Sequence, residues 1–474
     1  MQHQDKCDES ETLKLAAMIG LALLAFLLLL SGIFYKLRMS FLDGPFMIFQ
    51  IIEKDSPDIM VQRYGSIITQ VWPWLAQKCS LPMNIIMLVY SLSFNMFYFL
   101  TGAFLYKIRQ YRWVIILAFY QIAFCTDAFF WPNNEIHQGI AWLAATAGLW
   151  FFIEHSGVKY MGFRMLLAIL LTISLFTHPL MLPVVIFLVI LFVLEGVFKL
   201  NKREHQFILL FIFLVMVMKF YLSTNNWYDG AKFSILASQS PNKWLQVFNS
   251  HAMHSFVQDL FSRHWVAVFI FAVTLWVLII QRKFPIALFM TIFTLIYLLL
   301  VAMAFPDFKR FYIESQWMPI AIFIITPLVF NFHVFENKQR IVFFSLMVCI
   351  AWLMLMPGAV SMFQARYTRQ MEILNRMETK NISKLILTDV PDQIKEHIIL
   401  PWALPVESII LSSASNTVGR RSFLFEQPER ATKGTSIFLS AFENLDISTL
   451  DRRYFWLNNT EDYVVLKYST FMNE

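Results

Sequence analysis

Charged residues are scarce in this sequence. Asp, Glu, Lys and Arg together make up 15% of the chain, whereas hydrophobic residues make up 58%. An ordinary water-soluble domain carries about 25% charged residues, so this composition excludes a chain whose whole surface faces water. Several stretches between Leu13 and Pro357 are almost free of charge and approach the roughly 20 apolar residues that cross a bilayer. The sequence therefore predicts a multi-pass integral membrane protein.

Cysteine is also rare, with four residues in the whole chain. Cys125 and Cys349 fall within apolar stretches, and Cys79 stands alone in a connector, so neither a disulfide framework nor a cysteine-based metal motif is expected. Almost every Lys and Arg residue between the apolar stretches lies in a short connector. We assign the net charge of +6 to contact with anionic membrane lipids, and we expect no nucleic-acid partner.

The predicted fold is an all-α polytopic membrane protein. About eleven transmembrane helices are expected, namely Leu13–Tyr35, Met83–Tyr106, Trp113–Phe130, Gly139–Glu154, Met165–Phe176, Leu180–Phe198, Gln206–Leu222, Trp265–Ile280, Pro285–Phe305, Trp317–Val334 and Ile341–Met356. The segment Thr177-His178-Pro179 is either an outside turn or a re-entrant break within one span, and both readings remain open.

The distribution of basic residues predicts the orientation. With a cytoplasmic N-terminus, each inside connector is short and basic, whereas the outside connectors 131–138 and 177–183 contain no Lys or Arg. This is the positive-inside pattern, and only the loop 306–316 departs from it. The opening segment lacks the basic region and cleavage site of a cleaved signal peptide, so the first span is expected to be retained. We predict a bacterial inner-membrane protein with a periplasmic C-terminal domain.

Two domains are expected. Residues 1–357 form the transmembrane domain, which includes the outside loops 36–82 and 223–263. Residues 358–474 have the composition of a soluble, extracytoplasmic domain of α/β or β-rich type, entered by a polar helix over 364–380. Its predicted strands, which are rich in β-branched and aromatic residues, are Lys384–Leu387, Ser408–Leu411, Thr435–Leu439 and Tyr463–Tyr468.

Ionisable residues gather at the predicted outer ends of the spans. Because such groups are costly at membrane depth, they indicate a functional site. The candidate residues are Asp43, Arg63, Glu135, His137, His178, Lys309, Arg310 and Glu314. All reach the same side in the predicted topology, so we expect a charged cavity at the outer membrane face.

Each candidate also has a structural interpretation. Asp43 precedes Pro45 and could cap a helix. Glu135 and His137 could cap the next helix or face water. His178 could bond carbonyl groups that Pro179 leaves free. Lys309 and Arg310 could extend to lipid headgroups, and the acidic residues of 53–58 could form a solvated face.

The layout resembles the GT-C superfamily of integral-membrane glycosyltransferases, which includes protein mannosyltransferases and lipid A aminoarabinose transferases. The resemblance lies in the first outside loop with its early acid in Ser40-Phe41-Leu42-Asp43-Gly44-Pro45-Phe46, the many spans with short basic inside loops, and the outer C-terminal segment. Phe311-Tyr312-Ile313-Glu314-Ser315-Gln316-Trp317 is similar to the charged-then-aromatic entry to a late span in bacterial members. Many members carry an adjacent acidic pair followed by aromatic residues at this position. In this chain only Asp43 matches, and the second acid and the tyrosines are absent.

The resemblance implies inverting transfer of a sugar from a polyprenyl-phosphate donor to an unknown glycan, lipid or protein acceptor. Asp43 would be the catalytic base, and Arg63, Lys309 and Arg310 would stabilise the leaving phosphate. Glu135, His137, His178 and Glu314 would complete the substrate site. No metal ligands are assigned, although a divalent metal could serve the leaving group.

Three other function classes stay open. A non-catalytic GT-C-like scaffold is suggested by the missing second acid. A lipid or solute transporter would need paired breaks in two halves, and only one break, at His178-Pro179, is visible. An O-antigen ligase or polymerase would use a larger loop than 223–263.

Overall fold

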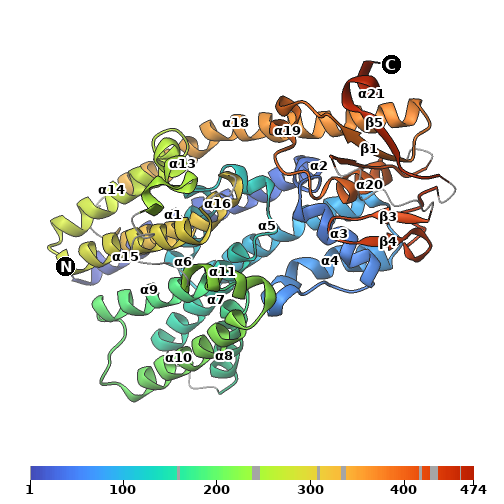
Figure 1. The fold of residues 1–474 in the computed structure, drawn as a ribbon. Coiled ribbons are helices and arrows are strands. Elements are labelled where there is room, and N and C mark those ends of the chain that lie inside the picture. Colours follow the sequence, from blue (N-terminus) through green and yellow to red (C-terminus); the bar gives the residue numbers. More distant parts are fainter. Residues whose placement is uncertain are drawn as a thin grey trace.

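The computed structural model describes residues 2–156, 161–237, 246–306, 310–332, 338–415, 419–426, 436–458 and 461–473. It is mainly helical (Figure 1). The elements of the first part are α1 (Gln2–Ile33), α2 (Tyr35–Arg38), α3 (Asp43–Lys54), η1 (Met60–Gln62), η2 (Tyr64–Ser66), α4 (Ile67–Lys78), α5 (Met83–Lys107), α6 (Tyr111–Ala123), η3 (Asp127–Phe130) and α7 (Glu135–Ser156).

The middle of the chain continues with helices. They are α8 (Met161–Leu175), α9 (Met181–Leu194), α10 (Arg203–Thr224), α11 (Trp227–Ala237), η4 (Val247–Asn249), α13 (His251–Asp259), α14 (Trp265–Ile280), α15 (Phe284–Ala304), α16 (Arg310–Trp317), α17 (Ile320–Phe330) and α18 (Lys338–Thr379).

The last part mixes strands and helices. It contains β1 (Lys384–Thr388), α19 (Asp392–Ile398), α20 (Leu404–Ala414), β2 (Ser422–Phe425), β3 (Ile437–Leu439), β4 (Asn444–Asp446), η7 (Ile447–Thr449), β5 (Val464–Lys467) and α21 (Tyr468–Asn473).

Six helices in the described ranges are long and apolar enough to cross a membrane, in α1, α5, α7, α10, α15 and α18. Shorter apolar helices include α6, α8, α9, α14 and α17. Large apolar side chains face outward, such as Phe207 and Tyr221 of α10, which are 71% and 66% exposed. Exposed apolar surface of this extent needs a hydrocarbon environment. The protein is therefore an all-α, multi-pass membrane protein in its main part.

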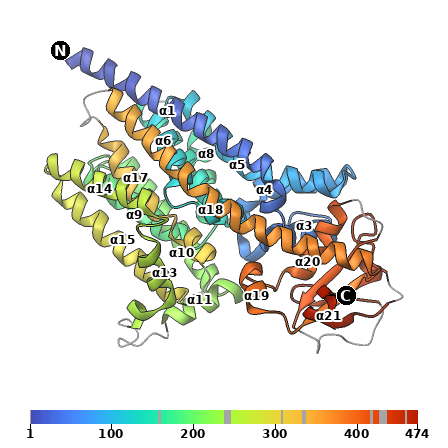
Figure 2. The same cartoon turned by 90° about the horizontal axis from the view of Figure 1, so that it is seen from above.

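Close helix packing organises the bundle around α1. Helix α1 lies against α5, α6 and α18, and Figure 2 shows α18 running alongside α1. Gly102 of α5 permits the close approach, because a Cβ at this position would lie 2.7 Å from Leu24 Cδ1 of α1. Small residues at such contacts are typical of membrane helices, where tight packing stabilises association. Helix α18 continues without a break through Pro357 to Thr379.

The C-terminal strands form two small sheets. The first is parallel, with the order β2-β1-β5, and pairs Leu385 with Phe423 and with Val464. Parallel neighbours need a crossover, which α19 and α20 supply between β1 and β2. The second sheet is the antiparallel pair β3-β4. Helix α20 packs against β2, α3 and α5, so this region contacts the loop that begins at residue 36.

The strand predictions met with mixed success. Strands were expected and are found at Lys384–Thr388, Ile437–Leu439 and Val464–Lys467, although Thr435 lies outside the described residues. The strand predicted at Ser408–Leu411 is wrong, because these residues belong to helix α20. A short apolar run does not distinguish a buried strand from a fully buried helix, and Ile409 and Ile410 are completely buried here.

Candidate functional site

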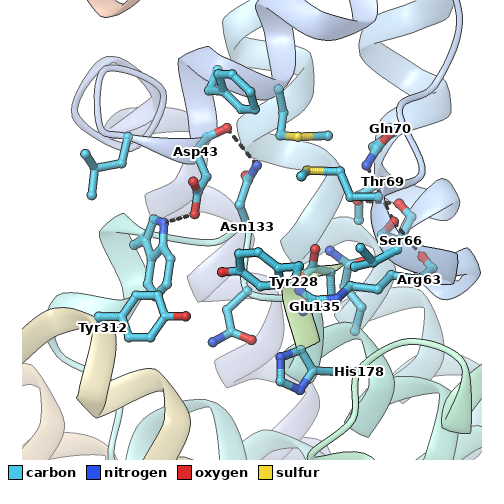
Figure 3. A pocket seen from close by; sticks show the side chains of 18 of the residues that line it. Asp43, Arg63, Ser66, Thr69, Gln70, Asn133, Glu135, His178, Tyr228 and Tyr312 are labelled. Carbon is cyan, nitrogen blue, oxygen red and sulfur yellow. Dashed lines mark hydrogen bonds and ion pairs between the residues drawn. The ribbon is translucent and has the colours of Figure 1, made fainter. Parts of the chain in front are cut away.

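A cavity of about 380 Å³ lies between the first loop, the start of α7, the α8–α9 turn, α11 and α16. Figure 3 shows the side chains that face it. Its polar wall includes Asp43, Arg63, Glu135, His178, Tyr228 and Tyr312. Trp402 and Phe442 from the C-terminal region also line the cavity. Of the predicted site residues, Asp43, Arg63, Glu135 and His178 are thus brought together.

Asp43 is the first residue of α3 and does not cap it. The N-cap position belongs to Leu42, and no side chain caps this helix end. The Asp43 carboxylate instead accepts a hydrogen bond of 2.8 Å from Trp131 Nε1. Asn133 Nδ2 donates to the Asp43 carbonyl oxygen at 3.0 Å, which also fixes the main chain (Figure 3). The capping interpretation is therefore wrong, and the carboxylate is held at the cavity wall.

The surroundings of Asp43 make its carboxyl weakly acidic. Burial raises its pKa to about 7, and the negative charge of Glu135 adds to this effect, whereas the hydrogen bond from Trp131 opposes it. A carboxylate that exchanges its proton near neutral pH is suited to general base catalysis. Perturbed carboxyls in a cavity are candidates for a functional site.

Strained backbone flanks the charged residues. Leu42 has φ of 46°, and Val61 and Gln62, just before Arg63, have φ of 42° and 56°. Left-handed φ is unfavourable for non-glycine residues, most of all for a β-branched Val, and such conformations persist only where surrounding contacts enforce them. At Leu42 the main-chain N–H donates to Glu407 Oε1 at 2.7 Å.

Arg63 stands between two carboxylates. Its Nη1 donates to Glu135 Oε2 at 2.8 Å, and its Nη2 donates to Asp229 Oδ1 at 2.7 Å. The guanidinium carbon also lies 5.3 Å from the centre of the Tyr228 ring. Arg63 is 7% exposed. Burial alone would lower its pKa, but Glu135 and Asp229 reverse this and raise it, so the guanidinium keeps its charge.

His178 is neutral in this setting. Burial lowers its pKa well below the ordinary value, and the positive charge of Arg63 lowers it further. Its Nδ1 accepts a hydrogen bond of 3.1 Å from the Leu180 N–H, which leaves the proton on Nε2. At this turn the ring accepts from an amide through Nδ1, and a bond from Nε2–H to a carbonyl that Pro179 leaves free stays a prediction.

Gly65 brings the first loop against the turn that holds His178. A Cβ built on Gly65 would overlap Thr177 Oγ1 and lie 2.9 Å from Thr177 Cβ. Only glycine fits at this contact. The absence of a side chain at Gly65 therefore allows the segment of Arg63 to pack against the turn of His178, and both residues line the cavity.

His137 and Glu314 lie outside this cavity wall. His137 Nδ1 is 2.7 Å from the Tyr120 hydroxyl, and Glu314 accepts hydrogen bonds of 2.7, 2.7 and 2.9 Å from Thr126 N–H, Thr126 Oγ1 and Ala128 N–H. Both side chains are buried. These contacts are structural, since they tie neighbouring segments together.

The structure does not describe the side chains of the two predicted cations in the loop 306–316. Lys309 lies outside the described residues, and Arg310 begins α16 with its side chain outside the described part. Their predicted roles remain predictions.

Several cavity residues were not among the predicted site residues, namely Trp131, Asn133, Tyr228 and Tyr312. Asp229, which binds Arg63 behind the cavity lining, was not among them either. Trp131 and Asn133 belong to the run Trp131-Pro132-Asn133-Asn134-Glu135, so its polar and aromatic character was an available signal. Asp229 is 166 positions from Arg63, and no local pattern links the two.

Among the described ranges no three His, Cys, Asp or Glu side chains gather as metal ligands do. Of the acids at the cavity, Glu135 is engaged with Arg63, whereas Asp43 points to Trp131.

Comparisons of the chain with protein-family models, curated proteins and solved structures give no match.

Proposed function

We propose that this protein is a GT-C-type membrane glycosyltransferase that moves a sugar from a polyprenyl-phosphate donor to an acceptor hydroxyl. The observation that carries the proposal is the Asp43 carboxylate, fixed by Trp131 at 2.8 Å on the wall of a cavity of about 380 Å³. Its pKa of about 7 suits proton abstraction near neutral pH.

In the proposed reaction, Asp43 takes the proton from the acceptor hydroxyl as that oxygen attacks the anomeric carbon. The new bond joins the acceptor oxygen to the anomeric carbon, and the bond from that carbon to the phosphate oxygen breaks. Attack from the face opposite to the leaving group inverts the anomeric configuration. The acceptor is an alcohol of a glycan, lipid or protein.

The leaving lipid phosphate carries negative charge that the enzyme must stabilise. Arg63 and Lys232 are cations on the described cavity wall, and Nε2–H of neutral His178 is a further donor. Lys309 and Arg310 are proposed to add to this charge. Glu135 and Asp229 hold the Arg63 guanidinium in place. A guanidinium in a fixed position can orient the phosphate as well as neutralise its charge.

The topology that accompanies this proposal has about eleven spans and a cytoplasmic N-terminus. The Asp43 cavity and a C-terminal domain of residues 358–474 would then face the periplasm of a bacterial inner membrane. The long apolar helices and the basic connectors between them support this arrangement.

The test is transfer from a panel of polyprenyl-phosphate sugars by purified protein. Wild type should transfer from at least one donor, and Asp43→Asn should lose about 10²- to 10⁴-fold in rate, as expected for removal of a general base. Asp58→Asn is the matched control. Asp58 lies in the same loop, its Oδ1 is 2.8 Å from Lys54 Nζ, and it does not line the cavity. Lipid-phosphate binding by wild type without transfer from any donor would favour the scaffold instead.

A further inference from the structure

Buried amide side chains line the Asp43 cavity. They come from α4, from the segment before α7, from α7 itself and from α16, and they are Gln70, Asn133, Gln138 and Gln316. All four are 8% exposed or less, and the side-chain oxygen of each has no hydrogen-bond partner among the described residues. A buried polar group without a partner costs free energy, so these amides indicate a ligand that forms hydrogen bonds with them.

Two of these amides are held at one end by the protein. Asn133 Nδ2 donates to the Asp43 carbonyl oxygen at 3.0 Å and to the Tyr90 hydroxyl at 3.1 Å. Gln70 Nε2 donates to Ser66 Oγ at 3.5 Å. A carbonyl oxygen only accepts hydrogen bonds, so the bond to Asp43 fixes which end of the Asn133 amide is the nitrogen. The oxygens of both amides remain as acceptors for a ligand.

Gln138 and Gln316 are held at neither end. Neither side chain makes a hydrogen bond to a described residue, although their exposures are only 1% and 2%. The terminal torsion of a glutamine is broad and roughly two-fold, so each amide can turn its oxygen or its NH2 group toward the cavity. Each can therefore accept a hydrogen bond from a ligand or donate one to it.

Amides in this state favour a ligand rich in hydroxyl groups. An ammonium group only donates hydrogen bonds and a carboxylate only accepts them, whereas a hydroxyl does both. One hydroxyl of the ligand can thus donate to the oxygen of Asn133 or Gln70 and also accept from a glutamine NH2 group. An uncharged sugar presents several such hydroxyls around one ring.

Aromatic rings on the cavity wall complement the amides. The rings of Trp402 and Phe442 are stacked with their centres 5.1 Å apart, and Phe46 lies edge-on to both, at 5.8 and 5.6 Å. All three residues line the cavity. The C–H faces of a sugar ring pack on aromatic surface while its hydroxyls meet polar groups. A largely apolar wall with a few placed polar groups is typical of a small-ligand site.

The amides connect the two groups that the proposed transfer needs. Asn133 is bonded to the main chain of Asp43, the proposed base (Figure 3). Gln138 lies about one helical turn after Glu135, which holds the proposed phosphate ligand Arg63. A sugar that contacts both amides lies between the base and the phosphate, which is where the transferred sugar has to be.

We propose that Gln138 and Gln316, together with the Asn133 and Gln70 oxygens, bind the hydroxyls of the transferred sugar, and that this sugar is uncharged. The inference rests on the proposed function of the cavity and adds the substrate class to it. A sugar acid would bring a carboxylate against the Asn133 and Gln70 oxygens, with which it forms no hydrogen bond.

The test measures binding of tritiated polyprenyl phosphate, with and without an attached sugar, to the full-length protein in phosphatidylcholine nanodiscs. The attached sugars are glucose, galactose and mannose, with glucosamine and glucuronic acid as charged counterparts. Wild type should bind at least one neutral-sugar lipid about 10-fold more tightly than bare polyprenyl phosphate, since several neutral hydrogen bonds form together. It should also bind that lipid more tightly than either charged counterpart.

Gln138→Met and Gln316→Met keep the length of the side chain and remove the amide. Each should weaken binding of the neutral-sugar lipid about 2- to 10-fold, as expected for loss of a neutral hydrogen bond, and should leave binding of bare polyprenyl phosphate unchanged. Gln121→Met is the matched control. Gln121 is 6% exposed, its Nε2 has no hydrogen-bond partner among the described residues, and it does not line the cavity.

Three results would overturn the inference. One is that wild type binds every sugar-bearing lipid no more tightly than bare polyprenyl phosphate. Another is that a charged-sugar lipid binds most tightly. The third is that the Gln138 and Gln316 variants bind the neutral-sugar lipid as Gln121→Met does. A variant that loses the bare lipid as well would show that its amide supports the fold and not the sugar, and the two variants lie on different helices.

Sugar transfer in the same preparation separates this inference from the proposed function. Tight, amide-dependent binding of a neutral sugar without transfer would support the sugar subsite and contradict the glycosyltransferase. Transfer that both glutamine variants leave unchanged would support the glycosyltransferase and contradict the sugar subsite.

Discussion

Arg366 of α18 and Glu407 of α20 form a fully buried ion pair, with Nη2 2.6 Å from Oε2 and side-chain exposures of 1% and 0%. Both partners also hold the chain just before Asp43. Arg366 Nη1 donates to the Ser40 carbonyl at 2.7 Å, and Glu407 Oε1 accepts from the Leu42 N–H at 2.7 Å. The C-terminal region thereby enforces the left-handed conformation of Leu42 that begins α3 at Asp43.

Removal of one partner of this pair should be severe. Arg366→Gln leaves the Glu407 carboxylate buried without its cation, and we expect the free energy of unfolding to fall by about 3–5 kcal/mol. Arg369→Gln is the control on the same helix, because the Arg369–Glu372 pair has the same 2.6 Å separation but is 29% and 45% exposed. Its loss should cost at most about 1 kcal/mol. If denaturant titrations show equal losses of unfolding free energy for Arg366→Gln and Arg369→Gln, the buried Arg366–Glu407 pair does not have the stabilising role described.

Asp43 should make stability depend on pH in a defined direction. Its pKa is raised from 3.8 to about 7 by burial and by Glu135, so the folded state binds the proton more tightly than the unfolded state. Stability from this group is full below pH 3.8 and declines as the pH rises toward 7. Asp43→Asn removes that decline.

The measurement is the unfolding free energy of wild type and Asp43→Asn at several pH values. The advantage of the Asn variant should grow by about 1–3 kcal/mol between pH 4 and pH 8. A difference that stays constant across this range would show that the carboxyl titrates as an ordinary exposed group.

Arg63 should be replaceable only together with its two acids. Arg63→Gln alone leaves Glu135 and Asp229 without their cation, and we expect a loss of about 3–5 kcal/mol. Adding Glu135→Gln and Asp229→Asn removes the unpaired charges and should restore much of the stability. Thermal unfolding of the single and triple variants checks this, and a triple variant less stable than Arg63→Gln would argue against the cluster.

The contact between Gly65 and Thr177 predicts a coupled pair of substitutions. Gly65→Ala forces a methyl group into the Thr177 side chain and should destabilise the protein by about 1–3 kcal/mol. Thr177→Ala should relieve part of that cost, since it removes the overlapping Oγ1. A double-mutant cycle measures the coupling, and strict additivity would mean that the two segments do not touch.

The sequence predicted the part of the site that depends on membrane topology. Asp43, Arg63, Glu135 and His178 were expected on one side because hydropathy and charge define which loop ends face the same way. Finer placement depends on helix rotation. Two residues turn an α-helix by about 200°, so Glu135 lines the cavity while His137 faces Tyr120.

Tertiary partners could not be predicted from local patterns. The pairing of Arg63 with Asp229 joins segments far apart in the chain. The Arg366–Glu407 ion pair depends on how α20 packs against α3 and α5. The strand expected at Ser408–Leu411 failed for the same reason, because burial on all sides makes helix and strand patterns alike.

We propose above all that Asp43 is the base that takes the proton from the acceptor hydroxyl, and one measurement tests this proposal most directly. Donor binding and sugar transfer are measured in the same nanodisc preparation for wild type and Asp43→Asn at saturating polyprenyl-phosphate sugar. The account predicts that the variant binds the donor as wild type does and that its turnover falls about 10²- to 10⁴-fold. Unchanged turnover in the Asn variant would contradict it.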